Sequence, residues 1–385
     1  MRRQPARVRI LERISQVPAA AWDACAGPDN PFLAHAFLLA LEESRSVVPD
    51  TGWLPHHVVV EDATGAVIGA VPAYLKGHSY GEYVFDHGWA HAYERAGGQY
   101  YPKLLAAVPF TPVPGHRLLL HPEAAPEVRD QLVGTLIEIA RQAELSSIHV
   151  NFATAEECQA LAAYGFLPRI GQQFHWENRG YRSFDDFLGE LASRKRKQVR
   201  REREGALADG VTIRALSGAE LTPRYWSAFY RFYLATADKK WGNAYLEKDF
   251  FLRLGETMGD RVVLVVAERD GRPIAGALNL RGTDTLYGRN WGAAEERPFL
   301  HFECCYYQAI EYAITHGLAR VEAGAQGMHK IQRGYLPVAT HSAHWIADPH
   351  LRAAIAQFLD QETPAMLAEM EALGEHSPYR SAAGG

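Results

Sequence analysis

The sequence predicts an α/β (α+β) protein built from two tandem copies of one unit, joined by a basic helix. Three observations predict this fold class. The chain has 385 residues, about twice the usual length of one domain. Hydrophobic residues make up 47% and charged residues 22% of it, an ordinary globular composition that excludes global disorder. The third observation is an internal repeat.

Two pairs of segments recur with the same internal spacing. Tyr-Gly-Phe-Leu-Pro at 164–168 is followed by His175-Trp176, and Gly-Tyr-Leu-Pro at 334–337 is followed by His344-Trp345. Ten positions separate Gly165 from His175 and Gly334 from His344. The segments 59–70 and 266–277 also match, each with a glutamate eight positions before a glycine. Two matches with preserved spacing indicate a diverged duplication.

The first copy shows alternating helical and strand patterns. A helix is expected to begin at Pro31, because proline suits the first helical position and Asn30 suits the cap before it. The expected elements, in order, are the helix Pro31–Glu43, the strands His57–Glu61, Ala66–Tyr74 and Tyr83–His87, the helix Pro126–Ala143, the strand Ser147–Phe152, the helix Ala155–Tyr164 and the strand Gln173–Glu177.

The second copy repeats this order. Its expected helices are Leu221–Thr236, Phe250–Thr257 and Phe302–His316, the last ended by Gly317. Its expected strands are Arg261–Glu268, Pro273–Leu280, Thr285–Trp291, Ala319–Ala323 and Ser342–Ile346. A charged helix over 183–209 separates the copies, and another helix, Leu351–Glu362, follows the second. The expected domains are therefore 1–180 and 211–360, with a basic connecting helix at 181–210 and a C-terminal tail at 361–385.

Charge and composition exclude several classes of protein. A net charge of −5 argues against a wholly basic nucleic-acid-binding protein, and four cysteines cannot form a disulfide framework. No signal peptide and no apolar run of bilayer-spanning length is recognisable, so a cytoplasmic location without a membrane span is expected. The G-x-S-x-G, H-E-x-x-H, C-x-x-C, G-x-G-x-x-G and Walker A motifs are missing, which argues against the enzymes they mark.

The connecting helix carries the strongest local charge. Residues 193–204 hold seven cationic and two acidic side chains. Arg196, Arg200 and Arg203 share one helical face, and arginine grips phosphate oxygens in a bidentate manner. This face is interpreted as an anchor for tRNA or for a diphosphate-bearing ligand, and a solvated connector explains the same pattern equally well.

Two further groups are candidate substrate contacts. Lys240, Trp241 and Tyr245 follow a helix, where the aromatic rings would stack on a substrate or would cover the core. Arg289, Asn290 and Trp291 end a strand, where ligands of open α/β sheets bind. Their polar groups would orient a carbonyl or a carboxylate, and a simple strand-end turn is the alternative.

The second copy also holds the candidate catalytic groups. Glu322 ends a strand and leads into a glycine-containing loop with Gln326, His329, Lys330 and Arg333. Glu322 or His329 would accept the proton of an attacking amine, and Lys330 and Arg333 would hold an anion. Glu303 is a further candidate base, although a carboxylate in the first turn of a helix also stabilises the helix without any other role. His301 and Cys304 are too few ligands for zinc, so no metal is expected.

Taken together, these motifs resemble the FemAB-like proteins of bacteria. The motifs that carry the resemblance are Arg194–Lys197 through Arg203, Lys240–Gly242, Leu286–Arg289, His301–Gln308, Gly324–Gly327 with His329-Lys330, and, in the first copy, Gly98–Leu104 and Pro109–Val113. The resemblance implies two tandem GNAT acyltransferase domains. It also implies a relationship to the Fem peptidyltransferases, which move an aminoacyl group from charged tRNA to an amine of a peptidoglycan precursor.

The resemblance makes an N-acyltransferase with a small-molecule or peptide amine acceptor the expected function. An enzyme of this kind is expected to need no metal or redox cofactor, and its expected donor is aminoacyl-tRNA or acyl-CoA. The segment 294–300 lacks the glycines of a GNAT pyrophosphate loop and contains Pro298 and two acids, which favours aminoacyl-tRNA. The alternatives are an acyl-CoA-dependent N-acetyltransferase and a non-catalytic binding protein. The sequence leaves the oligomeric state open.

Overall fold

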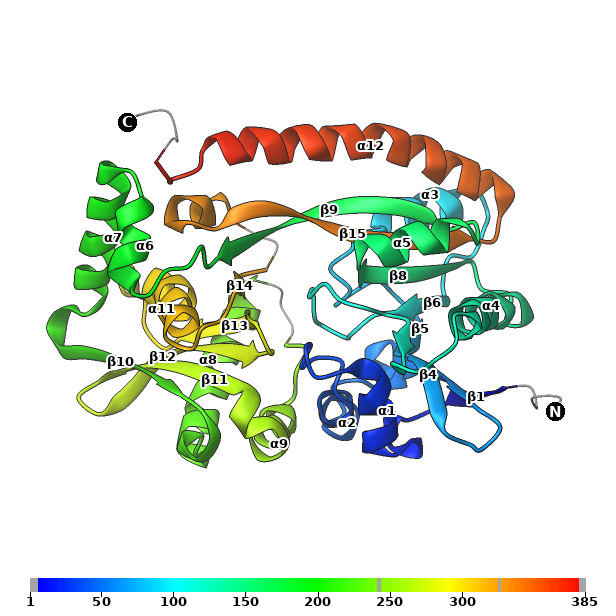
Figure 1. Ribbon diagram of the computed structural model, residues 1–385, viewed down its shortest axis with the longest axis horizontal. Helices are drawn as coiled ribbons and strands as arrows, with labels where there is room; N and C mark the ends of the chain where they lie inside the picture. Colours follow the sequence, from blue (N-terminus) through cyan, green and yellow to red (C-terminus); the bar gives the residue numbers. More distant parts are fainter. Residues whose placement is uncertain (1–5, 241–243, 325–326, 381–385) are drawn as a thin grey trace. The chain divides into compact units, whose positions relative to one another are not determined.

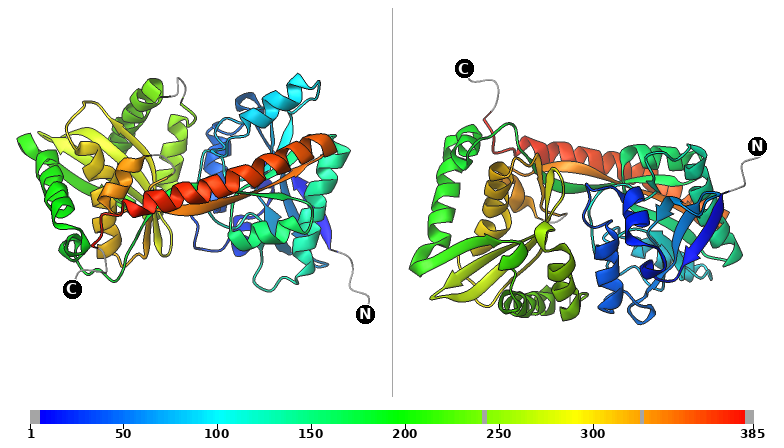
Figure 2. Two further views of the ribbon diagram at one scale, coloured as in Figure 1. Left: turned by 90° about the horizontal axis from the view of Figure 1, so that it is seen from above. Right: turned by 60° about the horizontal axis from the view of Figure 1, so that its bottom comes forward.

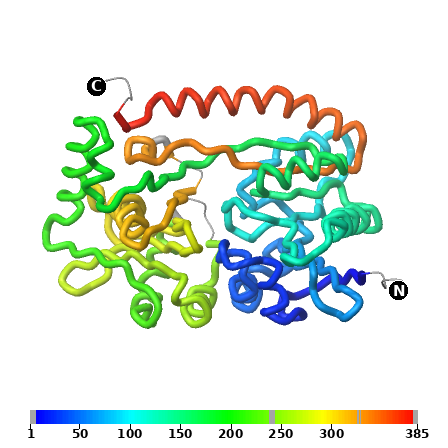
Figure 3. Tube along the Cα trace, viewed as in Figure 1, coloured from blue at the N-terminus to red at the C-terminus, as the bar shows by residue number. Residues whose placement is uncertain are grey.

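A computed structural model describes residues 6–240, 244–324 and 327–380. Two compact units are present, and neither is continuous in the sequence. Unit 1 consists of residues 1–171 and 339–367, and unit 2 consists of residues 172–338 and 368–385. The chain therefore leaves unit 1, builds most of unit 2, returns to unit 1 and ends in unit 2, a path that can be followed by colour in Figure 3.

Unit 1 contains two groups of hydrogen-bonded strands. The first, in spatial order, is β1 (Arg7–Leu11), β3 (His57–Glu61), β4 (Val67–Val71) and β7 (Leu119–Leu120). The second is β15 (Leu336–Ile346), β8 (Ser147–Ala153), β6 (Lys103–Ala106), β5 (Ala73–Lys76) and β2 (Trp53–Pro55). Within the second group β6 and β8 are parallel, whereas β8 and β15 are antiparallel.

Helices cover the strands of unit 1. Its helices are α1 (Ala19–Ala26), α2 (His35–Glu43), α3 (His87–Arg95), α4 (Glu127–Gln142), α5 (Ala155–Ala162) and the first part of α12 (Pro349–Glu375). Leu132 and Leu136 of α4 are fully buried against Val58, Leu104 and Ile148 of the strands. This apolar stripe at i and i+4 is the side of the helix that faces the sheet.

Unit 2 has one sheet with helices on both faces (Figures 1 and 2). Its strands, in spatial order, are β10 (Val211–Leu216), β11 (Val262–Arg269), β12 (Arg272–Arg281), β13 (Thr285–Ala293), β14 (Arg320–Glu322) and the end of β9 (Leu167–Glu177). Its helices are α6 (Phe184–Glu190), α7 (Ser193–Ala206), α8 (Pro223–Lys240), α9 (Lys248–Met258), α10 (Leu300–Phe302) and α11 (Gln308–Thr315). A π-helical turn, Glu303–Tyr307, joins α10 to α11, and a 3-10 helix spans Met328–Arg333.

The alternation of side chains along β12 sorts these helices between the two faces. A side chain at Gly276 would meet Phe229 of α8. The flanking Ala275 and Ala277 belong instead to the buried cluster that contains Leu300 and Cys304. Because successive strand residues point to opposite faces, α8 lies on one face and the α10–α11 segment on the other.

The last strand of each copy belongs to the other unit. His175–Glu177 of β9 pair with β14 in unit 2, and His341–Ile346 of β15 pair with β8 in unit 1. The repeated His-Trp pairs lie on these exchanged strands, so His175 lies in unit 2 and His344 in unit 1.

Several expected elements differ from the structure. No strand forms at 83–87, because Tyr83 has a positive φ of 59° and α3 begins at His87. The expected strand 66–74 is divided into β4 and β5 at Pro72, which has no amide hydrogen to donate to a ladder. The single helix expected at 183–209 is divided into α6 and α7, because buried Leu191 is extended.

The C-terminal helix is longer than expected. α12 continues from Pro349 to Glu375, with Pro364 inside it, where the sequence indicated an end near Glu362. Within the described residues, none of the helices combines the length and hydropathy needed to cross a bilayer.

Candidate functional site

The candidate site lies at the end of β14, where two parallel strands of unit 2 separate. β13 and β14 pair over three positions, from Thr285 opposite Arg320 to Tyr287 opposite Glu322. β14 ends there, whereas β13 continues to Ala293. The register between β12 and β13 is irregular at this level, and Arg289 has no residue opposite it. Ligands of open sheets approach where parallel strands end, and bulges re-aim side chains there.

Glu322 is buried at this point, with 5% of its surface exposed. Its Oε2 atom has no hydrogen-bond partner among the described residues. The nearest charged group is Arg320, whose Nη1 lies 3.9 Å from Oε1. Burial raises the pKa of Glu322 to about 8, although Arg320 and Arg289 act in the opposite direction. A carboxyl group with this pKa exchanges protons readily near neutral pH, as a general base requires.

A buried histidine faces the same carboxyl group. Nε2 of His175 lies 3.9 Å from Oε2 of Glu322 and 3.2 Å from Oε1 of Gln173. Burial, together with Arg320 and Lys330, lowers the pKa of His175 to about 3. The imidazole is therefore neutral at physiological pH and does not offset the negative charge of Glu322 when that group is ionised.

Lys330 shapes the loop that follows Glu322. Its ammonium group donates hydrogen bonds to the carbonyl oxygens of Ala323 at 2.6 Å and Gly324 at 2.9 Å. It also lies 5.7 Å from the ring centroid of Phe174, and only 4% of the residue is exposed. Lys330 thus holds the 3-10 helix against the end of β14 and places a positive charge beside the candidate site.

Three other candidates take part in two buried ion pairs beneath α7. Glu303 is fully buried and accepts hydrogen bonds from Arg203 at 3.0 to 3.2 Å and from Gln308 at 2.8 Å. Glu202 accepts two hydrogen bonds of 2.8 Å from Arg333 and one of 2.5 Å from Tyr307. These contacts attach α7 to the π-helical turn and to the 3-10 helix, so each group has a structural partner.

The remaining candidates are dispersed. Arg200 is exposed and 3.5 Å from Asp185, whereas Arg196 is partly buried on α7. His329 is exposed, with Nε2 2.9 Å from the hydroxyl of Tyr306. Arg289, Asn290 and Trp291 are partly exposed on β13. Tyr245 follows α8, and its backbone N–H donates a hydrogen bond to Tyr233 Oη. Trp241, Gln326 and the side chain of Lys240 lie outside the described residues.

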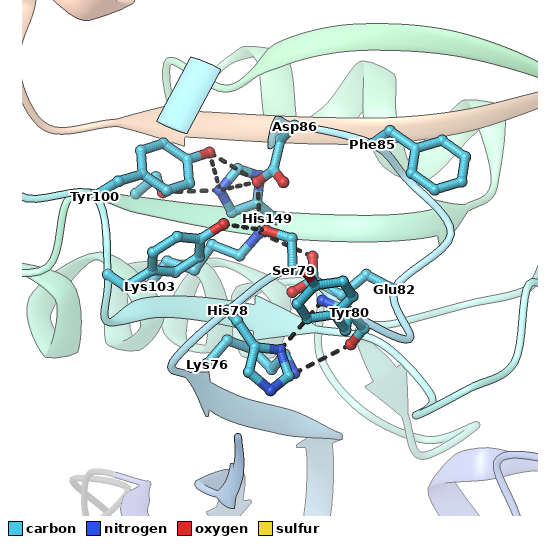
Figure 4. A network of polar contacts seen from close by, with 12 residues as sticks. Lys76, His78, Ser79, Tyr80, Glu82, Phe85, Asp86, Tyr100, Lys103 and His149 are labelled. Atoms are coloured by element: carbon cyan, nitrogen blue, oxygen red, sulfur yellow. Dashed lines mark hydrogen bonds and ion pairs between the residues drawn. The ribbon is translucent and has the colours of Figure 1, made fainter. Parts of the chain in front are cut away.

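Sequence reasoning missed Glu202, His175 and a polar network in unit 1. The network, shown in Figure 4, joins Lys103 to Glu82 and Asp86 and continues through Tyr100 to His149. His149 Nδ1 lies 2.7 Å from Nδ1 of His344 on the exchanged strand. The repeated His-Trp pair was the one available signal, because it marks His175 and His344 without showing what they contact.

Comparisons with known proteins identify the fold. The sequence matches a protein family described as peptidoglycan biosynthesis/recognition over residues 13–381. The structure is similar to that of FemX, with a TM-score of 0.55 and 14% identity, covering 88% of this chain and 98% of that one. It is also similar to the C-terminal domain of a proposed lysylphosphatidylglycerol synthetase from Agrobacterium fabrum, with a TM-score of 0.52 and 11% identity over 88% and 95% of the two chains.

L-PGS from Bacillus licheniformis is a further similar structure, with a TM-score of 0.51 and 9% identity over 86% of this chain and 98% of that one. No curated protein sequence matches the chain. The structural likenesses and the family match confirm the predicted fold class, an α/β protein with two GNAT-like domains. The basic helix α7 lies within unit 2.

Proposed function

Because the chain belongs to the FemAB-like family, we propose that it is an N-acyltransferase whose reaction takes place beside Glu322. The observation that carries this proposal is a buried carboxylate at the point where β13 and β14 separate, one of whose oxygens has no partner in the described part of the chain. Its pKa of about 8 suits a group that must take a proton from an amine. The proposed setting is the cytoplasm, where charged tRNA is available.

The reaction begins with deprotonation of the acceptor amine by Glu322. The amine nitrogen then attacks the carbonyl carbon of an activated ester, so that a C–N bond forms and the C–O bond to the leaving group breaks. The proton held by Glu322 passes to the leaving oxygen, which regenerates the carboxylate. Lys330, 4% exposed and bound to the loop carbonyls, stabilises negative charge that develops on the carbonyl oxygen.

Aminoacyl-tRNA is the proposed donor, because the segment before α10 offers little to a CoA pyrophosphate. Glu295 lies 3.3 Å from Arg269, and Arg297 already pairs with Asp209 at 2.8 Å and with the carbonyl of Ala208. α10 has only three residues before the π-helical turn begins. The amide groups of Leu300 and Glu303 already donate to the carbonyls of Arg297 and Phe299, so fewer amide groups are free to hold a phosphate at this helix N-terminus.

The proposed tRNA contact is the exposed side of α7. Arg203 is engaged with Glu303, so the face formed by Arg196, Arg200 and Arg203 is only partly available. Arg194, Lys197 and Arg201 are exposed, follow one another at i, i+3 and i+7, and have no ion-pair partner among the described residues. Like charges at these spacings destabilise an isolated helix. A polyanionic partner such as tRNA would offset this repulsion, which supports the proposed contact.

The test is single-turnover transfer from bulk aminoacyl-tRNA to an added amine, with acetyl-CoA as the competing donor. Wild-type protein should transfer the aminoacyl group, and Glu322→Gln should not, although it binds tRNA normally. Transfer from acetyl-CoA alone would instead support an N-acetyltransferase. Normal tRNA binding with no transfer by the wild type to a panel of primary amines would favour a non-catalytic binding protein.

A further inference from the structure

A row of three buried side chains crosses the strands of unit 1. Trp53 of β2 lies directly opposite Lys76 of β5, which lies directly opposite Lys103 of β6. Directly opposite residues on neighbouring strands share a face of the sheet. All three residues have no exposed surface, and Lys76 Nζ lies 3.6 Å from the ring centroid of Trp53. Two ammonium groups are thus buried side by side with an indole ring.

The loop 77–86 brings two carboxylates to this row (Figure 4). Lys103 Nζ donates hydrogen bonds to Ser79 Oγ at 2.7 Å, Glu82 Oε2 at 2.8 Å and Asp86 Oδ2 at 2.5 Å. An ammonium group has three hydrogens, so Lys103 is fully satisfied. Glu82 and Asp86 are only 4% and 2% exposed.

Other polar atoms of this cluster are unsatisfied. Glu82 Oε1, Asp86 Oδ1 and the indole N–H of Trp53 have no hydrogen-bond partner in the part of the chain that the structure describes. Lys76 Nζ has one long hydrogen bond, 3.4 Å to the carbonyl of Tyr80. Each unsatisfied buried polar group costs roughly 1–3 kcal/mol. Two acceptors and one donor of this cluster thus lack partners among the described residues, and Lys76 Nζ has a single long hydrogen bond. Together they point to a ligand that carries both donors and acceptors.

The charges define the ligand further. Two lysines and two carboxylates sum to zero, so a ligand with net charge would bury an uncompensated charge. Burial raises the pKa of Glu82 to about 7 and lowers that of Lys76 to about 7. The ionised and the neutral forms of these two groups are therefore close in free energy, and a ligand with one charge of each sign would stabilise the ionised forms.

We propose that the loop 77–86 and the row Trp53–Lys76–Lys103 form a binding site for a small zwitterion, a free α-amino acid. Its ammonium group would donate to Glu82 Oε1 and Asp86 Oδ1, and its carboxylate would accept from Lys76 Nζ and Trp53 Nε1. The site lies at the start of the parallel strands β6 and β8, whereas Glu322 lies at the end of β14 in unit 2. The residues proposed for the zwitterion and the residue proposed for the transfer reaction therefore belong to different units.

Hydrogen bonds outside the network also attach the loop to unit 1. Gly77 N–H donates to the carbonyl of Gly52 at 3.3 Å, and Phe110 N–H donates to the carbonyl of Gly81 at 3.1 Å. Arg169 donates to the carbonyl of Phe85 at 2.8 Å, and Ser79 Oγ lies 2.8 Å from Tyr101 Oη. Gly81 has a φ of 80°, which favours glycine. Tyr80 and Phe85 are 62% and 64% exposed on the same loop. A ligand would enter by displacement of this loop.

The experiment measures thermal unfolding and calorimetric binding of the full chain with three probes: L-alanine, ethylamine and propionate. Alanine carries both charges, and each of the others carries one. A ligand that binds the native state raises Tm as its concentration rises. Alanine should bind saturably, and roughly tenfold or more tightly than either single-charge probe, a difference expected if both ends are recognised. Equal binding of all three probes, or no saturable alanine binding, overturns the proposal.

Matched variants place the binding at these residues. Lys76→Met and Glu82→Gln keep side-chain size, and each should weaken alanine binding by roughly tenfold or more. Glu94→Gln, at an exposed position on α3, should bind as the wild type does. Circular dichroism shows whether each variant is folded. Unchanged binding by folded Lys76→Met and Glu82→Gln contradicts the proposal. Glu322→Gln should also bind alanine normally, which separates this test from that of the transferase.

Discussion

Two regions of unit 2 bury carboxylates in different ways. Beneath α7, Glu202 and Glu303 are each paired with an arginine. At the end of β14, Glu322 has an oxygen without a partner among the residues that the structure describes, and the closest charged nitrogen of these residues is 3.9 Å away. Burial is nearly complete in all three. The difference shows that the partner of a buried acid, rather than its burial, decides whether it stabilises the fold or remains available for chemistry.

The largest expected effect follows from replacing Glu322. Glu322→Gln should lower the single-turnover rate of aminoacyl transfer by about 10²–10⁴-fold, the usual contribution of a general base, while the protein stays folded. Glu303→Gln should leave the rate per folded molecule nearly unchanged, because Glu303 is occupied by Arg203 and Gln308. If the two variants lost activity equally, the distinction between the two regions would be wrong.

Substitutions in the region beneath α7, where the carboxylates are paired, should change the free energy of unfolding. Glu202→Ala leaves Arg333 and Tyr307 without their buried acceptor and should lower the free energy of unfolding by about 3–5 kcal/mol. Glu204→Ala, an exposed position two residues along the same helix, should change it by less than about 0.5 kcal/mol. Chemical denaturation measures both. A stable Glu202→Ala variant without transfer activity would assign Arg333 to catalysis.

The unpaired carboxyl should make stability depend on pH. The native protein keeps the proton of Glu322 up to about pH 8, whereas the ordinary value is 4.5. Between these values the native state binds one more proton than the unfolded chain, so stability falls as pH rises, by up to about 1.4 kcal/mol per pH unit. Glu322→Gln removes this contribution. The stability of the variant relative to the wild type should therefore increase from pH 5 to 8, which urea titrations at a series of pH values would check.

The smallest expected effect concerns the exposed side of α7. Arg201→Ala should weaken tRNA binding modestly and reduce the slope of log K against log salt concentration by roughly 0.7–0.9, the loss of one phosphate contact. Arg182→Ala removes the same charge from a side chain that is 93% exposed outside the helices, and it should leave the slope unchanged. Binding measured by filter retention over a range of salt concentrations compares the two. Equal slopes would show that α7 does not contact tRNA.

The repeat and the fold class could be predicted because they depend on local patterns. Periodic apolar residues identified β11, β12, α8 and α11, and the spacing of Tyr-Gly-Phe and Gly-Tyr-Leu to the His-Trp pairs identified the duplication. The exchange of the last strands could not be predicted. The sequence around His175 and His344 is the same whether each strand pairs within its own copy or with the other one. Tertiary contacts decide which strand it pairs with.

The candidate site was predictable in part. Glu322 and Lys330 stood out because a strand followed by a short glycine loop places polar groups at a sheet edge. Arg203 and Arg333 looked equally suitable as anion ligands, yet their acids, Glu303 and Glu202, are 100 and 131 positions away in the sequence. Pairings over such distances leave no local pattern. The ion pairs of Lys103 could not be predicted either, because its partners Glu82 and Asp86 lie in a segment whose sequence resembled a strand.

The exchanged strands also constrain how the chain acquires its structure during synthesis. The residues of β8 are made long before their neighbour in unit 1, residues 341–346 of β15, leaves the ribosome. Until then one edge of β8 lacks its native partner, although β6 is already present on the other side. An unpaired edge is a template for wrong pairing. The sheet of unit 1 is therefore complete only after residues 341–346 have been made, although β2, β5, β6 and β8 all lie before residue 154.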